Sequence, residues 1–224
     1  HGIFNASDGL HARWYRAAAL HTARWARDPL ADGRMAGRLQ GFLRLDAALA
    51  HELAAANASL APMGLDPEYV TAIDAPSAAA RSGLPLVDGA WCYGEAGWLA
   101  PRDWARHLLA SSGATWRGGV AVHRLCRGGA GWQAFDAQGH LLAEAPVLVL
   151  AHALGAHTCW PDGVDTLPLR FNRGQTTVLP ADLPGLRRPR LPLSGRGYAL
   201  TLPGGEVLVG ATQQPGDLDS PWRE

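Results

Sequence analysis

The clearest structural signal in this chain is the stretch Gly197–Gly210, which reads GYALTLPGGEVLVG. Two runs rich in apolar and β-branched residues, Gly197–Leu202 and Glu206–Gly210, flank the turn Pro203-Gly204-Gly205. Two such runs joined by a short glycine turn predict a β-hairpin. We therefore expect this part of the chain to lie in an antiparallel sheet.

Further strand patterns occur on the N-terminal side of this hairpin. Val147–Ala151 is a continuous apolar run, as expected of a strand that is covered on both faces. The shorter runs before it are separated by glycine clusters, which suggests a meander. The other expected strands are Gly37–Leu45, Tyr69–Ile73, Val120–Leu125, Gly131–Phe135, Leu141–Ala143 and Gln175–Leu179.

Four segments have helical patterns. In Leu10–Arg27, which ends at Asp28-Pro29, an apolar face is predicted from residues at helical spacing; these are Leu10, Trp14, Ala17, Ala18, His21 and Trp25. The other helices are expected over Ala47–Asn57 after the N-cap Asp46, between Asp74 and Gly83, and over Pro101–Ser112. Because helices and strands mix without a regular βαβ alternation, we predict an α+β (mixed α/β) fold.

Composition limits the classes of function. The 224 residues are 47% hydrophobic and 18% charged, which excludes disorder and predicts one or two domains with a sizeable core. The 20 basic residues, all arginines, balance 20 acidic ones, so any polyanionic partner must be bound by a local patch. Arg187, Arg188 and Arg190 form one candidate patch for backbone phosphates, or a solvated loop.

Several classes of site have no motif in this sequence. There is no G-x-S-x-G, H-E-x-x-H, P-loop or G-x-G-x-x-G motif. We expect no metal site, because His152 and His157 have poor ligand spacing and the three cysteines form no C-x-x-C pair. The cysteines read as reduced thiols of a cytoplasmic protein. No apolar run approaches the roughly 20 residues of a membrane-spanning helix, so no membrane partner is expected.

Four segments, taken in order, carry a family resemblance. They are His1–Phe4 with Asp8-Gly9 and a following helix, Glu95–Pro101 (EAGWLAP), Asn172–Gln175 (NRGQ), and the hairpin strands continuing to Thr212. This series resembles the D-amino-acid-oxidase-like flavoproteins. Within them, it is most similar to the oxidoreductase part of bifunctional enzymes that modify the wobble uridine of tRNA.

The resemblance implies a division into an FAD-binding domain and a substrate domain with a mixed or antiparallel sheet. Residues 1–30 then form a linking helix of the FAD domain, and 115–160 form a further part of that domain. The substrate domain comprises 31–114 and 161–224. In this family the N-terminal Rossmann βαβ unit precedes the segment that starts with His1, so we expect the chain to be a fragment.

The resemblance also implies roles for individual residues. Tyr198 and Arg173 are expected to face the substrate. Each has a structural alternative, because Tyr198 can be a half-buried strand aromatic and Arg173 a surface salt-bridge partner. Four residues are expected to lie against FAD: Val120, Ala151, Gly174 and Gln175. Trp98 is expected either at the mouth of the site or in the core.

The implied reaction is an FAD-dependent removal of the carboxymethyl group from carboxymethylaminomethyl-uridine in tRNA, with release of glyoxylate. One alternative is a small-molecule amine oxidase acting on glycine, sarcosine or a D-amino acid. Another is a flavin-free fragment that binds only RNA or a protein partner, which the missing G-x-G-x-x-G motif favours for this chain. The sequence leaves the oligomeric state open.

Overall fold

The computed structural model describes residues 1–129, 131–153, 159–160 and 170–217. The chain divides into two compact units. The first comprises His1–Gly113 and Gly174–Gln213, and the second comprises Ala114–Arg173 and Gln214–Glu224. The domain limits that the resemblance implies stay predictions. None of the described helices is both long and apolar enough to cross a membrane.

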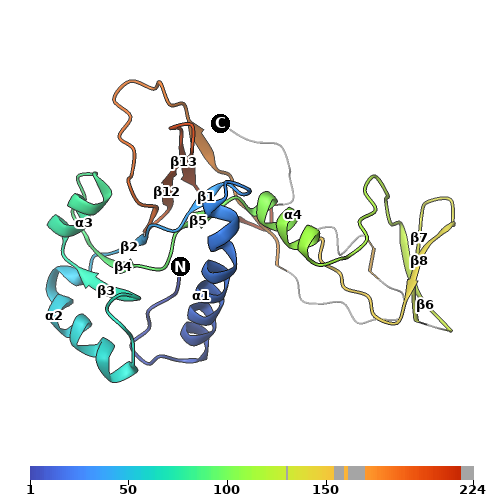
Figure 1. The fold of residues 1–224 in the computed structure, drawn as a ribbon, viewed down its shortest axis with the longest axis horizontal. Coiled ribbons are helices and arrows are strands. Elements are labelled where there is room, and N and C mark those ends of the chain that lie inside the picture. Colours follow the sequence, from blue (N-terminus) through green and yellow to red (C-terminus); the bar gives the residue numbers. More distant parts are fainter. Residues whose placement is uncertain (130, 154–158, 161–169, 218–224) are drawn as a thin grey trace. The chain divides into compact units, whose positions relative to one another are not determined.

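The first unit is built on a seven-stranded sheet in the order β10-β13-β12-β11-β2-β4-β3 (Figure 1). Its neighbouring strands are antiparallel except for β11 and β2, which are parallel. The strands are β2 (Phe42–Asp46), β3 (Val70–Ile73), β4 (Gly89–Tyr93), β10 (Thr177–Leu179), β11 (Leu193–Ser194), β12 (Tyr198–Thr201) and β13 (Val207–Gly210). A separate pair joins β1 (Gly37–Arg38) to β5 (Trp98–Leu99).

Strand β4 is buried along its whole length, and its side chains divide the core in two. Trp91 and Tyr93 lie in one cluster with residues of α2 (Leu49–Leu60). Ala90 and Cys92 lie in a second cluster with Ala78 of α3 (Ala75–Ser82). Because successive side chains of a strand point to opposite faces, α2 and α3 cover opposite faces of the sheet. Sequence reasoning missed this strand.

Local turn chemistry explains the elements that were predicted well. Asp74 caps α3 by accepting a hydrogen bond from the Ser77 backbone N–H at 2.8 Å, and Gly83 ends the helix at φ +73°. The predicted hairpin is confirmed as β12 and β13, with Gly205 at φ +89° in its turn. Asp46 does not cap α2 as predicted, because its carboxylate accepts from Ala48 N–H in a turn before the helix.

The first helix, α1 (Leu10–Ala31), corrects two predictions. It continues through Pro29, whose burial offsets the backbone hydrogen bond that a proline lacks. The expected apolar face is exposed, with Leu10 81% and Trp14 71% accessible. The buried side instead consists of small residues and Pro29, namely Ala12, Ala23, Ala26 and Pro29. Small side chains let the helix backbone approach its neighbours more closely than tryptophans could.

The N-terminal segment packs on the α2 side of the sheet. Phe4 stacks on Trp91 with ring centroids 3.9 Å apart, and its backbone N–H donates to the Tyr93 hydroxyl at 2.9 Å. Gly2 leaves no room for a side chain, because a Cβ there would lie 1.9 Å from the Tyr69 hydroxyl. That hydroxyl is buried and has no hydrogen-bond partner among the described residues.

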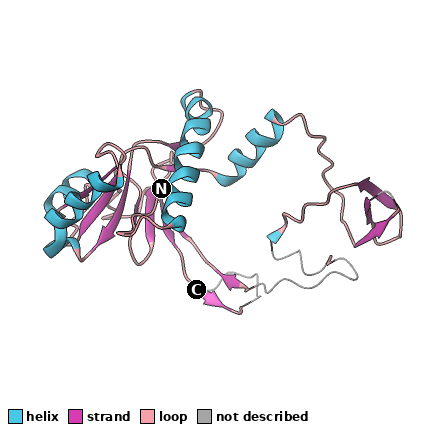
Figure 2. Ribbon diagram, turned by 90° about the horizontal axis from the view of Figure 1, so that it is seen from below, coloured by secondary structure: helices cyan, strands magenta, loops and turns pink. Residues whose placement is uncertain are grey.

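The second unit contains a three-stranded antiparallel meander, drawn in magenta in Figure 2. The meander is formed by β6 (Arg124–Gly128), β7 (Gly131–Phe135) and β8 (Leu141–Ala145), and a short pair is formed by β9 (Asn172–Arg173) and β14 (Gln214–Pro215). The prediction of a buried strand over Val147–Ala151 is wrong, because this segment is irregular and Val149 is 78% exposed. A buried strand needs hydrogen-bonded neighbours on both sides, and no described residues supply them.

Of the remaining elements, some match predicted segments with shifted limits, and others, among them β5, β11 and the 3-10 turn η1 (Ala61–Met63), were not predicted. Helix α4 spans Pro101–Ser111. The predicted strand Gly37–Leu45 is divided into β1 and β2, with Gly41 at φ +102° between them. Together these elements make the predicted mixed α/β fold.

Burial of β3 gives a prediction on stability. Val70 is 1% exposed, whereas Val87 in the same unit is 87% exposed. Val70→Ala is expected to lower the free energy of unfolding by about 2 kcal/mol, because it removes buried methyl groups and leaves a cavity. Val87→Ala, the matched control, should change it by less than about 0.5 kcal/mol. Urea unfolding of both variants measures the difference, and equal values would contradict this core.

The unpartnered hydroxyl of Tyr69 gives a prediction on pH. Burial raises the pKa of Tyr69 from 10.0 to about 12. Between these two values the side chain is ionised in the unfolded state but neutral in the folded state, so stability should fall as the pH rises. Tyr69→Phe should remove this part of the alkaline destabilisation while costing little at pH 7, because no hydrogen bond is lost. Thermal unfolding across this pH range measures it, and an unchanged slope in the variant would refute the assignment.

Candidate functional site

Tyr198 lies where β12 begins, opposite Gly210 of β13. A Cβ at Gly210 would lie 2.9 Å from Cζ and Oη of Tyr198 and 2.9 Å from Cγ2 of Thr176. The end of the phenol ring therefore lies close to the Gly210 backbone, and a side chain at position 210 would require Tyr198 or Thr176 to shift. Tyr198 is half-buried.

Gly174 and Gln175 join this region through Thr212. The backbone N–H of Gln175 donates to the Thr212 hydroxyl at 3.0 Å, and the Thr212 N–H donates to the Gln175 carbonyl at 3.0 Å. A Cβ at Gly174 would lie 3.4 Å from the Thr212 carbonyl oxygen. The structure thus brings three of the predicted residues, Tyr198, Gly174 and Gln175, to the same end of the β12–β13 hairpin.

Arg173 belongs to the second unit, where β9 pairs with β14. Its guanidinium Nη1 donates to the Gln214 side-chain oxygen at 2.6 Å, and the side chain is half-buried. The alternative of a surface salt-bridge partner and the role toward a substrate both stay predictions for Arg173.

The two other predicted flavin contacts do not lie on strands. Val120 is 43% exposed on irregular backbone, because β6 begins only at Arg124. Ala151 is also exposed on irregular backbone, at the end of the segment that was expected to be a buried strand. Of the two histidines considered as metal ligands, His152 is among the described residues and His157 lies outside them. No described group of three or more His, Cys, Asp or Glu side chains could hold a metal ion.

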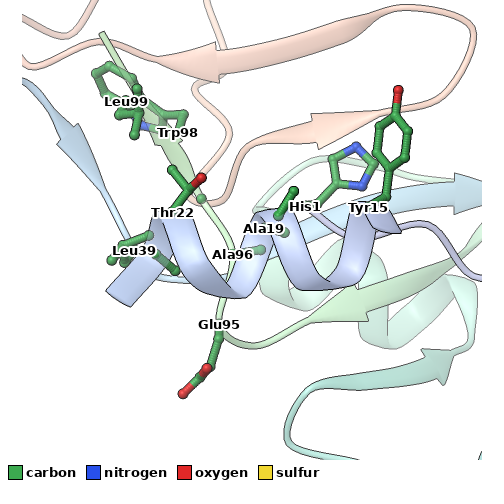
Figure 3. Close-up of a pocket in the computed structure, with 12 residues that line it drawn as sticks. His1, Tyr15, Ala19, Thr22, Leu39, Glu95, Ala96, Trp98 and Leu99 are labelled. Atoms are coloured by element: carbon green, nitrogen blue, oxygen red, sulfur yellow. The ribbon is translucent and has the colours of Figure 1, made fainter. Parts of the chain in front are cut away.

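A hollow of about 300 Å³ lies between α1 and β5 in the first unit (Figure 3). Its wall includes His1, Tyr15, Thr22 and Trp98. Figure 3 shows His1 and Tyr15 together at one end of the hollow and Trp98 at the other, with Ala19 of α1 between them. The hollow was not predicted, because the sequence pattern assigned a different, only partly overlapping face of α1 to the interior.

The described residues do not form a complete site for FAD. A dinucleotide pyrophosphate is usually bound at the N-terminus of a helix that follows a strand and a glycine-rich turn. The four described helices follow Gly9, Ala48, Asp74 and Ala100, and none of these starts has such a turn. The pyrophosphate of FAD therefore does not fit the described residues alone.

Comparison with protein families gives a match over the whole chain. A family model described as "DAO: FAD dependent oxidoreductase" matches residues 1–224. The tRNA 5-methylaminomethyl-2-thiouridine biosynthesis bifunctional protein MnmC of Methylibium petroleiphilum is 46% identical over 231 residues. The protein of the same name from Paraburkholderia phytofirmans is 35% identical over 229 residues. The matches cover 100% of this chain but only 35% and 34% of these relatives.

Solved structures share the fold at lower identity. Iminodiacetate oxidase from Chelativorans sp. BNC1 has a TM-score of 0.71 and 21% identity, covering 94% of this chain and 59% of its own. L-proline dehydrogenase from P. horikoshii has a TM-score of 0.74 and 12% identity, covering 99% and 62%. Glycine oxidase from Geobacillus kaustophilus has a TM-score of 0.65 and 21% identity, covering 89% and 56%.

The incomplete dinucleotide site gives a prediction on cofactor binding. The purified 224-residue chain should show no flavin absorbance bands and should not quench added FAD in a fluorescence titration. The physical reason is that no described helix start can receive the pyrophosphate. A mass of 23.7 kDa by intact mass spectrometry confirms which chain is measured. Stoichiometric flavin at that mass would show that this conclusion is wrong.

Proposed function

Because the chain belongs to the DAO family of FAD dependent oxidoreductases, we propose that it is the substrate-side part of an oxidoreductase that acts on tRNA. The observation that carries this proposal is the 46% identity, over the whole chain, to an enzyme named for tRNA 5-methylaminomethyl-2-thiouridine biosynthesis. The structural similarity to glycine oxidase and iminodiacetate oxidase supports a shared fold. Because the sequence identity is only 21% in each case, it favours no particular small-molecule substrate.

The proposed substrate is a wobble uridine that carries a carboxymethylaminomethyl group. In net terms, the carbon between the amine and the carboxylate loses two electrons, one water is taken up, and glyoxylate leaves a primary amine on the uridine. FAD accepts electrons in reactions of this class. The residues of this chain are proposed to bind and orient the substrate, which is sufficient for an oxidation that needs no separate acid–base pair.

Tyr198 is the residue to which we assign the substrate carboxylate. Its ring end lies close to the Gly210 backbone, where a Cβ would be 2.9 Å from the hydroxyl oxygen. A phenol donates one hydrogen bond, and a carboxylate is an acceptor that makes such a bond stronger than a neutral partner would. Gly174 and Gln175 are proposed to approach the flavin, and Arg173 to contribute positive charge.

The function is tested with the full-length protein and tRNA that carries the modified uridine. Glyoxylate release that requires this tRNA supports the proposal. Turnover of free glycine, sarcosine or a D-amino acid without tRNA would instead indicate a small-molecule amine oxidase. Bound tRNA without any glyoxylate would indicate a protein that only binds RNA.

Tyr198→Phe tests the carboxylate assignment. Losing one hydrogen bond to a charged group should lower kcat/KM for tRNA by about 10- to 100-fold. Tyr69→Phe is the matched control, since it removes a hydroxyl without a partner among the described residues and should leave kcat/KM unchanged. Equal activity of the Tyr198 variant and the parent would exclude Tyr198 from carboxylate binding.

A further inference from the structure

A second hollow in the first unit is lined by three arginines from distant parts of the sequence. Arg38 of β1, together with Arg188 and Arg190, surrounds a space of about 220 Å³ whose wall also contains Trp98 and Thr201. We name this space the arginine hollow. All of these residues belong to the first unit. The sequence pattern had grouped Arg187 with Arg188 and Arg190, but Arg187 does not line the hollow and Arg38 does.

Hydrogen bonds to backbone carbonyls order the guanidinium group of Arg188, and the Arg190 Nη1 lies 3.5 Å from the Ala80 carbonyl oxygen. The Arg188 Nε donates to the Gly205 carbonyl at 2.7 Å, and its Nη2 donates to the Ala181 carbonyl. The Arg190 side chain crosses the end of α3, where its Nε would lie 3.2 Å from a Cβ at Gly83. The Arg190 backbone N–H also donates to the Ser82 carbonyl at 2.8 Å. These arginines are therefore partly ordered before any ligand binds, which reduces the entropy lost on binding.

The third arginine is placed by strand pairing. Arg38 is the register partner of Trp98 in the β1–β5 pair. The loop that carries the other two arginines is tied to β12, because the Thr201 hydroxyl donates to the Pro189 carbonyl at 2.7 Å. The hollow is thus formed by two strand pairs and one anchored loop.

The charge of the hollow is not neutralised by acidic side chains. Within the described part of the chain, no ion pair involves Arg38, Arg188 or Arg190. No aspartate or glutamate lines the hollow. Three positive side chains thus converge on one concave surface of a protein whose formal net charge is zero. Such a local patch is what an anionic partner needs when the whole molecule exerts no attractive field.

The size and chemistry of the hollow favour a phosphate group presented by a polymer. Its volume is below the roughly 300–1,000 Å³ typical of sites that enclose a small molecule. Guanidinium groups bind phosphate oxygens through two parallel hydrogen bonds. The wall also contains the half-buried Trp98, and aromatic side chains of this kind stack on RNA bases. Phosphates together with unstacked bases are characteristic of RNA.

We propose that the arginine hollow binds the phosphate backbone of the tRNA substrate, with Trp98 available to stack a neighbouring base. This proposal rests on the proposed function, because that function makes tRNA the substrate. It adds a docking surface that is separate from the reacting group. Tyr198 and Thr201 are three residues apart on β12, and side chains of odd separation point to opposite faces of a strand. The hollow therefore contributes to binding and not to the chemical step.

The test uses the full-length protein and compares Arg38→Gln and Arg190→Gln with the control Arg187→Gln. All three changes remove one exposed positive charge, but only the first two alter the hollow. Binding of tRNA is measured by fluorescence anisotropy between about 50 and 200 mM salt. Glyoxylate release is measured at saturating tRNA. Circular dichroism and thermal unfolding confirm that each variant is folded.

Each hollow variant should weaken tRNA binding about 5- to 10-fold and reduce the slope of log affinity against log salt by about 0.7–0.9. The rate at saturating tRNA should stay that of the parent, and Arg187→Gln should bind within about twofold of the parent. Unchanged binding by both hollow variants would overturn the proposal. So would an equal loss in Arg187→Gln, because general charge and not the hollow would then explain the effect.

The outcome for the proposed function is read separately. If the parent binds tRNA through the hollow but releases no glyoxylate, the docking surface stands and the proposed reaction is wrong. If the parent releases glyoxylate from tRNA and the hollow variants do so with unchanged KM, the reaction stands and the docking surface is wrong.

Discussion

The first unit depends on the burial of β4 from both sides. Its large residues, Trp91 and Tyr93, pack toward α2 and the N-terminal segment, whereas its small residues, Ala90 and Cys92, pack toward α3. This asymmetry allows α3 to approach the sheet closely and leaves space for aromatic stacking on the other side. A strand that is buried on both faces must also satisfy its backbone groups with neighbours, and β2 and β3 supply them.

The parallel contact between β2 and β11 extends this constraint to the candidate site. Leu193 pairs with Leu43, which joins segments 150 positions apart in the sequence. Strand β12, which carries Tyr198, pairs with β11, and β11 pairs with β2. The position of Tyr198 in the first unit therefore depends on this long-range contact. The same contact brings the loop that holds Arg188 and Arg190 toward β1. Pairing over such a separation has a high loop-closure cost, which the buried core must offset.

Sequence reasoning succeeded where a structure is set by neighbouring residues. The N-cap Asp74, the C-cap Gly83 and the turn Pro203-Gly204-Gly205 each act within a few residues, and each was predicted. It failed where distant packing decides the outcome. The periodicity of α1 identified a helix but not which side is buried, because close packing selected its alanines over Trp14 and Trp25.

The candidate site shows the same division. Tyr198 lies on the β12–β13 hairpin, and Gly174 and Gln175 lie just before the adjoining strand β10. A resemblance in sequence order was enough to group them. Val120 and Ala151 were assigned to strands that need neighbours from elsewhere, and the structure gives neither residue a strand. The missed strand β4 did carry a signal, since Ala90–Tyr93 is a continuous apolar run after Asp88-Gly89.

The two faces of β12 bear on the class of substrate. Tyr198 points to one face and Thr201, at the arginine hollow, to the other, with about 10 Å of strand between them. A free amino acid is too short to contact both places at once. A folded RNA is large enough to place a backbone phosphate in the hollow and still present a side group to Tyr198. If both assignments hold, the geometry itself selects against small amines, because they forgo the binding energy of the arginines that a tRNA obtains.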